Sequence, residues 1–297
     1  MRILVLGGTI FLGRQLVEAA VARGHDVTLF NRGRTKPDLF PEVEKLRGDR
    51  EAGELEALRG RSWDAVVDTS GHVPRVVRQS AELLTGAVGH YTFVSSASVY
   101  MPTAKLGVTE EDPVHELEDE GSEDVAAHYG PLKVACERAV ERSFPGRGLV
   151  VRPGVVAGPH DPTGRFSYWV EQVARGGGVR APAPPEARVQ LIDARDLTGW
   201  LVGLAEEGTA GTFNAAGPEQ TFAGMLHACR AAAGSDARIV WVDEDDLPLA
   251  LDPDRRPEWA GFFAVSSEKA RRRGLETRPL EETARAILKA GRVPAAT

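Results

Sequence analysis

The sequence has few cysteines: Cys136 and Cys229 are the only two among 297 residues. Two isolated thiols cannot build the disulfide framework of a small secreted domain, and each lies in a stretch that reads as an amphipathic helix. No spacing of cysteine and histidine resembles a zinc site. We therefore expect buried, reduced thiols and no bound metal.

Long apolar runs and an excess of positive charge are also missing. No apolar run approaches the ~20 residues that a membrane span needs. The chain starts with a short strand-like run at residues 2–6, where a signal peptide would have a long apolar stretch. The formal net charge of −7 disfavours nucleic acid or a membrane surface as a partner. These absences predict a cytoplasmic protein with no membrane partner.

Hydrophobic residues make up 42% of the chain and charged residues 27%, which is enough apolar material for a buried core. Apolar runs of strand length with little alternation are typical of strands buried on both faces; they lie at 3–6, 27–30, 65–67, 91–94 and 149–151. Amphipathic helices are predicted between them at 12–23, 51–59, 74–84 and 128–142. This alternation predicts an α/β fold with a doubly wound parallel sheet.

A glycine-rich segment, GGTIFLG at 7–13, follows the first strand and opens the first helix. Gly7 permits a tight turn, Gly13 permits close packing of helix on strand, and the helix N-terminus offers N–H groups to a pyrophosphate. This context predicts a Rossmann-type dinucleotide site formed by Gly7, Thr9, Ile10, Phe11, Leu12 and Gly13. Ile10 stands where a middle glycine would let the diphosphate approach, so we expect it to hold the cofactor further out or to weaken binding.

The end of the second strand reads FNRGR and bears on the choice of cofactor. It lacks the acid that would bind the ribose 2′-hydroxyl of NAD, and its arginines can pair with a 2′-phosphate. We therefore expect Asn31, Arg32 and Arg34 to bind the cofactor, with NADP preferred over NAD; the other interpretation is a solvated basic turn. Asp49 either accepts from the adenine amino group or caps the following helix.

Tyr129 and Lys133 are four residues apart and so share one face of a helix. A nearby ammonium lowers the pKa of a phenol, which suits it to acid–base work. Pro131 fits only if the helix begins close to Tyr129. The strand ending near Val94 is followed by SSASVY, whose hydroxyls either bind a substrate oxygen or satisfy turn backbone.

Taken in order, these motifs resemble the extended short-chain dehydrogenase/reductase superfamily, in its NAD(P)-dependent epimerase/dehydratase group. The matching segments are GGTIFLG, FNRGR, Gly48-Asp49, FVSSASVY, YGPLK, VRPG with Gly158-Pro159, and LIDARDL, which together cover roughly residues 1–220. Three features depart from the usual pattern: Ile10, the sequence DTSGH at 68–72, and the acidic insertion between Ser96 and Tyr129. With them the chain is similar to an atypical branch that includes chloroplast stem-loop-binding proteins, although Tyr129 and Lys133 are both present.

The resemblance implies a catalytic role for three residues. Tyr129 would exchange a proton with a substrate hydroxyl or carbonyl oxygen, which Ser96 would orient. Lys133 would hold the nicotinamide ribose and lower the pKa of the tyrosine, while a hydride moves between the nicotinamide and a substrate carbon. Further cofactor contacts are expected from Thr69, Ser70, Gly71 and Pro153.

The rest of the chain differs in composition and in its pattern of predicted elements. Loops rich in glycine and proline are expected at 158–165 and 176–187, strands at 189–192 and 238–242, and helices at 195–206, 222–233 and near 280–290. The acidic stretch 110–124 is expected to be a solvated loop. We predict a mainly dinucleotide-binding domain at 1–157 and a smaller, interleaved substrate-binding region at 158–297. The strand and helix near 187–217 are expected to return to the first domain.

The predicted function is that of an NAD(P)-dependent epimerase, dehydratase or reductase acting on a nucleotide-activated sugar or a similar polar substrate. Arg165 and Arg188 are either ligands of a substrate phosphate or solvent-exposed arginines. The alternative is a non-catalytic Rossmann-fold binding protein, such as an RNA-binding or NADP-sensing relative. The protein is expected to be a monomer or a homodimer.

Overall fold

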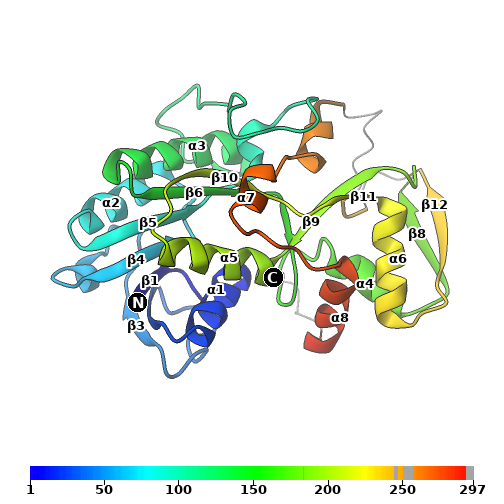
Figure 1. The fold of residues 1–297 in the computed structure, drawn as a ribbon, viewed down its shortest axis with the longest axis horizontal. Helices are drawn as coiled ribbons and strands as arrows, with labels where there is room; N and C mark the ends of the chain where they lie inside the picture. The colour runs from blue at the N-terminus through cyan, green and yellow to red at the C-terminus, as the bar shows by residue number, and fades with distance from the viewer. Residues whose placement is uncertain (183, 244–246, 250–256, 292–297) are drawn as a thin grey trace. The chain divides into compact units, whose positions relative to one another are not determined.

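The computed structural model describes residues 1–182, 184–243, 247–249 and 257–291. Its ribbon is shown in Figure 1. The chain forms two compact units, and each is assembled from separate segments. The first unit comprises Met1–Tyr100, Glu110–Pro153 and Leu197–Asn214, and the second comprises Met101–Thr109, Gly154–Asp196 and Ala215–Thr297.

The first unit is built on a seven-stranded sheet with the order β10-β6-β5-β4-β1-β2-β3. Its strands are β1 (Arg2–Leu6), β2 (Asp26–Asn31), β3 (Glu44–Arg47), β4 (Trp63–Asp68), β5 (Val88–Val94), β6 (Gly148–Pro153) and β10 (Gly211–Ala215). All pairings from β3 to β6 are parallel, so these strands end at one edge. The strand order reverses between β1 and β4, which is where open α/β sheets bind their ligands.

Four helices flank this sheet: α1 (Phe11–Ala22), α2 (Pro74–Leu84), α3 (Val125–Ser143) and α5 (Ala194–Glu206). Figure 1 shows α2 and α3 on one side of the sheet and α1 and α5 on the other. Pro74 occupies the first turn of α2, and the Asp124 carboxylate caps α3 by accepting from the N–H groups of Ala126 and Ala127. The predicted doubly wound α/β fold is thereby confirmed.

The five predicted strands of the sheet are confirmed, because their apolar runs are almost completely buried. Ile3–Leu6 is at most 1% exposed, for example. The sequence did not predict β3, whose four residues EKLR contain one apolar side chain. The predicted helix at 51–59 is wrong. The chain there makes tight turns around Gly53, which has φ +76°, and only Glu56–Leu58 forms a short 3-10 helix.

The second unit contains two small sheets. One has the order β11-β9-β7, formed by β7 (Val155–Ala157), β9 (Arg188–Asp193) and β11 (Glu219–Thr221); the other pairs β8 (Gly178–Pro182) with β12 (Arg238–Val242). Its helices are α4 (Ser167–Ala174), α6 (Phe222–Ala233), α7 (Glu268–Arg272) and α8 (Leu280–Ala290), with a 3-10 segment at Pro257–Phe263. The predicted strands and helices at 189–192, 222–233, 238–242 and 280–290 are confirmed.

Two expectations about this region need correction. Of the strand and helix near 187–217 that are predicted to return to the first domain, the strand β9 pairs with β7 and β11 and belongs to the second unit, whereas most of the helix α5 belongs to the first. The part of 187–217 that lies in the first unit is Leu197–Asn214. The expected loop at 176–187 contains β8, and residue 183 of that loop lies outside the described residues. Residues 110–124 form turns and bends, as expected for the acidic loop.

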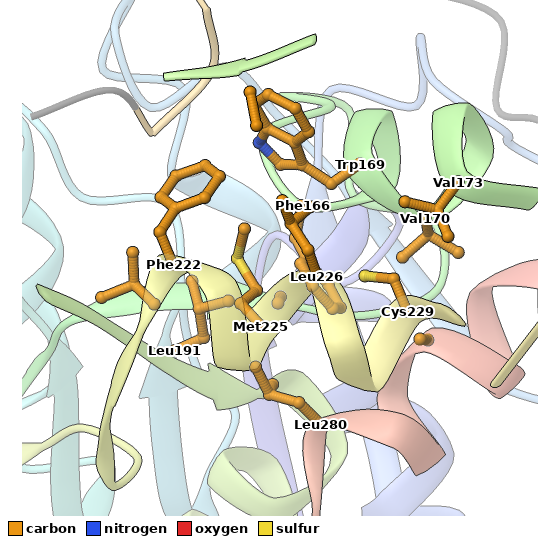
Figure 2. Packing of buried hydrophobic residues seen from close by; sticks show 14 of the residues in the cluster. Phe166, Trp169, Val170, Val173, Leu191, Phe222, Met225, Leu226, Cys229 and Leu280 are labelled. Atoms are coloured by element: carbon orange, nitrogen blue, oxygen red, sulfur yellow. The ribbon is translucent and has the colours of Figure 1, made fainter. Parts of the chain in front are cut away.

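The core of the second unit is centred on aromatic residues of α4 and α6 (Figure 2). The Phe222 ring lies 5.1 Å from the Trp169 ring in an edge-to-face arrangement. The indole Nε1 of Trp169 donates to the Pro248 carbonyl at 2.9 Å, so its one polar atom is satisfied. Cys229 packs in the same core, and Cys136 is buried in the first unit, as expected for both thiols. Among the described residues no helix is long and apolar enough to cross a bilayer.

We predict that Phe222→Ala lowers the free energy of unfolding by about 3–5 kcal/mol, because it removes a ring that is 1% exposed and leaves a cavity against Trp169. Urea unfolding followed by tryptophan fluorescence measures the change. Val240 in β12 is 49% exposed, so Val240→Thr should stay within about 0.5 kcal/mol of the original. Equal losses in the two variants would contradict this packing.

Candidate functional site

The glycine-rich loop connects β1 to α1 at the carboxyl edge of the first unit's sheet. Gly7 and Gly8 have φ of +114° and +96°, which glycine adopts without strain. A Cβ on Gly13 would lie 2.8 Å from the Gly8 backbone nitrogen and 3.0 Å from the Thr69 hydroxyl. Gly13 therefore lets α1 pack directly on the turn, as the motif predicted.

The N-terminus of α1 is suited to an anion. No described side chain caps it, and its first turn contains no acidic residue. The first N–H groups of the helix thus remain available to a bound phosphate. Ile10 precedes the helix with φ −121° and ψ 138°, an extended conformation open to any residue, and its side chain is 51% exposed.

The arginines of the predicted basic turn after β2 lie close to Asp49, which follows β3. The Asp49 carboxylate lies 4.0 Å from a guanidinium nitrogen of Arg32 and 3.8 Å from one of Arg34. Asn31 faces the protein: its amide nitrogen donates to the Gly7 carbonyl at 2.8 Å, and its oxygen accepts from Arg47 and from the Gly33 N–H. Asn31 therefore shapes the turn, while the two exposed arginines present their charge to solvent.

The loop after β4 is tied to the end of β1. The hydroxyls of Thr69 and Ser70 both donate to the Leu6 carbonyl, at 3.1 and 3.0 Å. The Gly71 carbonyl accepts from the Lys133 ammonium at 2.7 Å. These three predicted cofactor residues lie beside the glycine-rich loop. Pro153, the fourth, is buried at the end of β6.

Helix α3 carries Tyr129 and Lys133 and contains a kink. His128 has non-helical torsions, φ −127° and ψ 31°, so a new helical run starts at Tyr129 and Pro131 falls in its first turn. The helical run therefore begins close to Tyr129, as the presence of Pro131 required. The Tyr129 side chain is 36% exposed, and its ring centroid lies 6.2 Å from that of His72.

Lys133 lies one turn further along α3 and is buried at 2% exposure. Its ammonium donates to the carbonyls of Gly71 and Val94, each at 2.7 Å, and lies 4.3 Å from the centre of the Phe93 ring. It thus joins the ends of β4 and β5. Burial lowers the pKa of Lys133 to about 8, although the carboxylates of Asp68 and Glu137 act in the opposite direction.

The serines that follow β5 have different surroundings. Ser95 is buried and donates to the Glu137 carboxylate, so it is structural. Ser96 is partly exposed, and its hydroxyl contacts the hydroxyl and the N–H of Ser98, each at 3.1 Å. A Cβ on Gly130 would lie 2.2 Å from the Ser98 carbonyl oxygen, so only glycine lets α3 come this close. Ser96 and Ser98 are thereby held near the start of the helical run at Tyr129.

A buried polar network that the sequence analysis missed supports this serine loop. The Arg152 guanidinium donates to both oxygens of Glu137, at 3.0 and 2.7 Å, and to the Tyr100 hydroxyl at 2.7 Å. Tyr100 in turn donates to the Asn214 side-chain oxygen at 2.8 Å. The network connects α3, β6, β10 and the serine loop. Its sequence signal is charge within two apolar stretches: Arg152 in VVRP, and Glu137 in VACERAV.

A second missed network contains Arg50, in the loop after β3, and Asp68, at the end of β4. Two guanidinium nitrogens of Arg50 donate to the two oxygens of Asp68 at 2.8 and 2.7 Å, and both side chains are buried. The Arg50 guanidinium holds the pKa of Asp68 below its usual value against the opposing effect of burial.

The remaining predicted ligands lie in the second unit. Arg188 pairs with Glu219 at the surface. Arg165 follows the Asp161–Thr163 turn, in which the Thr163 N–H and hydroxyl both donate to Asp161 at 2.9 Å. Their predicted contact with a substrate phosphate stays a prediction. No three His, Cys, Asp or Glu side chains of the described chain come together in an arrangement that could hold a metal ion.

Comparison with known proteins identifies relatives. A family model described as the NAD dependent epimerase/dehydratase family matches residues 3–216. The chloroplast stem-loop binding protein of 41 kDa b from Arabidopsis thaliana is 28% identical over 254 residues. That match covers 78% of this chain and 63% of the relative, so it spans less than two thirds of the relative's length. The family resemblance seen in the sequence is confirmed.

Solved structures share the fold. The UDP-glucose 4-epimerase of Thermotoga maritima, crystallised with UDP-glucose, has a TM-score of 0.73 and 20% identity, with 98% of each chain covered. The dTDP-glucose 4,6-dehydratase of Bacillus anthracis, in complex with NAD, has a TM-score of 0.72 and 17% identity, with 98% of this chain and 96% of that chain covered. At these identities the likeness shows the fold alone.

We predict that Lys133→Met removes a pH-dependent part of the stability. The pKa of Lys133 in the folded protein, about 8, lies below that of lysine in an unfolded chain, about 10.4. Between these values the unfolded chain binds more protons, so this lysine adds stability as the pH rises and the gain is lost as the pH falls through about 8.

Urea unfolding at about pH 7 and about pH 10 should therefore show a rise of a few kcal/mol in the original protein relative to Lys133→Met. Lys36 is exposed, so Lys36→Met is the control and should follow the original protein. The same pH dependence in all three proteins would contradict a lowered pKa for Lys133 in the folded protein.

Proposed function

Because the chain belongs to the NAD-dependent epimerase/dehydratase family, we propose that it is an NAD(P)-dependent epimerase, dehydratase or reductase. The proposed substrate is a nucleotide-activated sugar or a similar small polar molecule with a hydroxyl or carbonyl carbon. The observation that carries the proposal is the position of Lys133. Its ammonium joins the ends of β4 and β5, at the sheet edge that also carries the glycine-rich loop, with Tyr129 one helical turn away.

The residues at this edge fit a dinucleotide. The uncapped N-terminus of α1 and the turn at Gly7 and Gly8 can accept a diphosphate. An ammonium has three N–H donors, and Gly71 and Val94 take two of those on Lys133. We assign the third donor to the nicotinamide ribose. The bound cofactor would accept and return a hydride.

The chain's own residues supply the proton chemistry. Tyr129 is exposed enough to meet a substrate oxygen, and we assign it as the acid–base group that moves a proton to or from that oxygen. Lys133 lies one turn further along the same face of α3. Ser96 is assigned to orient the same oxygen by a hydrogen bond, since Ser95 is engaged with Glu137.

We propose that NADP is preferred over NAD, although the family is described as NAD dependent. Arg32 and Arg34 are exposed beside the end of β2, where a 2′-phosphate would lie. Asp49 faces both arginines and is the candidate for the adenine amino group. A cytoplasmic location and a monomeric or homodimeric state stay predictions.

The second candidate is a non-catalytic binding protein, favoured by the relative whose name says that it binds stem-loops. The net charge of −7 and the presence of both Tyr129 and Lys133 favour the enzyme. Binding to RNA would be strongly salt-dependent. A gel-shift assay with a stem-loop RNA at low salt separates the two, because an enzyme with no RNA partner gives no shifted band.

We predict that Tyr129→Phe lowers turnover by about 10²–10⁴-fold, because the acid–base hydroxyl is lost. Cofactor affinity should stay nearly unchanged. Turnover is measured over a panel of nucleotide sugars with NAD and NADP, and affinity by nicotinamide fluorescence. Tyr168→Phe removes a hydroxyl from the second unit and should keep full activity. Unchanged turnover in Tyr129→Phe would contradict the assignment.

We predict that the double variant Arg32→Gln and Arg34→Gln binds NADPH at least about tenfold more weakly, because two charges facing the 2′-phosphate are removed. NADH affinity should change little. Arg142→Gln at the end of α3 is the control and should keep both affinities. Assay of the dinucleotide released when the purified protein is denatured identifies the natural cofactor. An equal loss for NADPH and NADH would refute the preference.

A further inference from the structure

We infer that the buried ion pair of Arg50 and Asp68 positions the cofactor site, holding its adenine side and its nicotinamide side in register. This inference rests on the proposed dinucleotide site. Neither residue is assigned a contact with cofactor or substrate. Both act through neighbours that belong to the site, so they are positioning residues.

The ion pair is the centre of a dense set of hydrogen bonds. Besides the two bonds between Arg50 and Asp68, the Arg50 guanidinium donates to the Ser80 hydroxyl of α2 at 2.8 Å. The Tyr91 hydroxyl of β5 donates to Asp68 at 3.0 Å, and so does the Ser70 N–H. One buried pair therefore connects the loop after β3, the end of β4, β5 and α2.

A short path leads from the pair to the glycine-rich loop. Arg50 donates to the Ser70 hydroxyl at 3.2 Å, and that hydroxyl donates to the Leu6 carbonyl, directly before Gly7. The neighbouring Thr69 hydroxyl lies 2.8 Å and 3.0 Å from the points where a Cβ on Gly7 and Gly13 would stand. Any shift of residues 68–70 is therefore transmitted to the turn that would hold the diphosphate.

A second path leads to the adenine side. Arg50 directly follows Asp49, which faces Arg32 and Arg34, and its buried side chain anchors this loop to the end of β4. Asp49 accepts from the Glu51 N–H at 3.1 Å, so the turn is ordered on both sides of Arg50. Gly48 allows this fold, because a Cβ there would lie 2.2 Å from the Glu54 carbonyl oxygen.

A third path leads to Lys133. The Gly71 carbonyl that accepts from Lys133 is three residues beyond Asp68, on the same loop. The negative charge of Asp68 also supports the protonated form of the lysine. The ion pair thus has a route to each predicted end of the cofactor: through Asp49 to the adenine, through Gly7 to the diphosphate, and through Gly71 to the nicotinamide ribose.

A contribution to folding stability does not by itself explain why a buried ion pair is present here. Replacing a buried ion pair by apolar side chains of similar volume is often neutral or stabilising, because the charges lose their hydration. The Arg50 Nε has no hydrogen-bond partner among the described residues, so the pair is not fully satisfied. What an apolar pair cannot supply are the bonds to the Ser70 N–H and hydroxyl, which set the path of the loop.

The test compares the double variant Arg50→Met and Asp68→Leu with Arg147→Met. Arg147 donates to the carbonyls of Val88 and Thr85 at the opposite edge of the sheet, so its loss affects the fold but not the site. Thermal unfolding and titration with NADPH and NADH are measured for each. We expect the double variant to unfold within about 5 °C of the original but to bind its dinucleotide about 10- to 100-fold more weakly. Arg147→Met should lose stability and keep its affinity.

Titration with a fragment of the cofactor distinguishes a positioning role from a purely structural one. If the two sides of the site lose their register, binding of NADPH should weaken more than binding of 2′-phospho-AMP, because the fragment contacts only the adenine side. If the double variant does not fold, Arg50→Lys keeps the charge and loses the two-pronged contact, and it should show the same selective loss. Unchanged dinucleotide affinity in the folded variants would overturn the inference. Failure of the original protein to bind either dinucleotide would instead overturn the proposed function.

Discussion

At the carboxyl edge of the first unit's sheet, one buried interaction joins the loops that follow β3 and β4, the ion pair of Arg50 and Asp68. Parallel strands that are buried on both faces supply apolar side chains, and they leave the loops at their ends to be fixed by polar contacts. A charge that is removed from water must be paired, so the pair restricts where both loops can lie. Asp68 accepts from the Ser70 N–H, and Arg50 and Tyr91 donate to the same carboxylate. The turn of the glycine-rich loop is built on that arrangement.

Helix α3 is fixed to the same edge in a comparable way, but by two separate charges. Lys133 reaches between the ends of β4 and β5, and Glu137, one turn later, joins Arg152 of β6 and Ser95. The face of the helix that presents Tyr129 is therefore held by buried polar bonds as well as by apolar packing. The kink at His128 starts a new helical run at Tyr129, so that Pro131 lies in its first turn, where proline is tolerated. The catalytic assignment of Tyr129 depends on this fixed orientation.

The sequence predicted those elements that are determined by neighbouring residues along the chain. Apolar runs such as 3–6 and 65–67 became central strands, and the glycine spacing located the turn between β1 and α1. Strand β3 escaped prediction because one apolar residue in EKLR gives no period, and the helix at 51–59 failed because Gly53 starts a tight turn. The partners of Arg50, Glu137 and Arg152 could not be predicted, since they are brought together by the sheet rather than by spacing. For the same reason the residues alone did not show that Glu137 holds Ser95; only the family resemblance singled out Ser96.

Ile10 departs from the motif while its torsions and exposure leave the turn unstrained, so its predicted effect concerns the ligand. Its extended torsions suit any residue, so the backbone does not require glycine there, in contrast to Gly7 and Gly8 with their positive φ. The close contacts of the turn involve Gly13 and Thr69 and leave the branched side chain of Ile10 half exposed. Its effect must therefore fall on whatever approaches the uncapped N-terminus of α1. A diphosphate at that terminus would meet a methyl-bearing surface where the usual glycine offers bare backbone, which is why the expected weakening concerns the cofactor and not the stability of the turn.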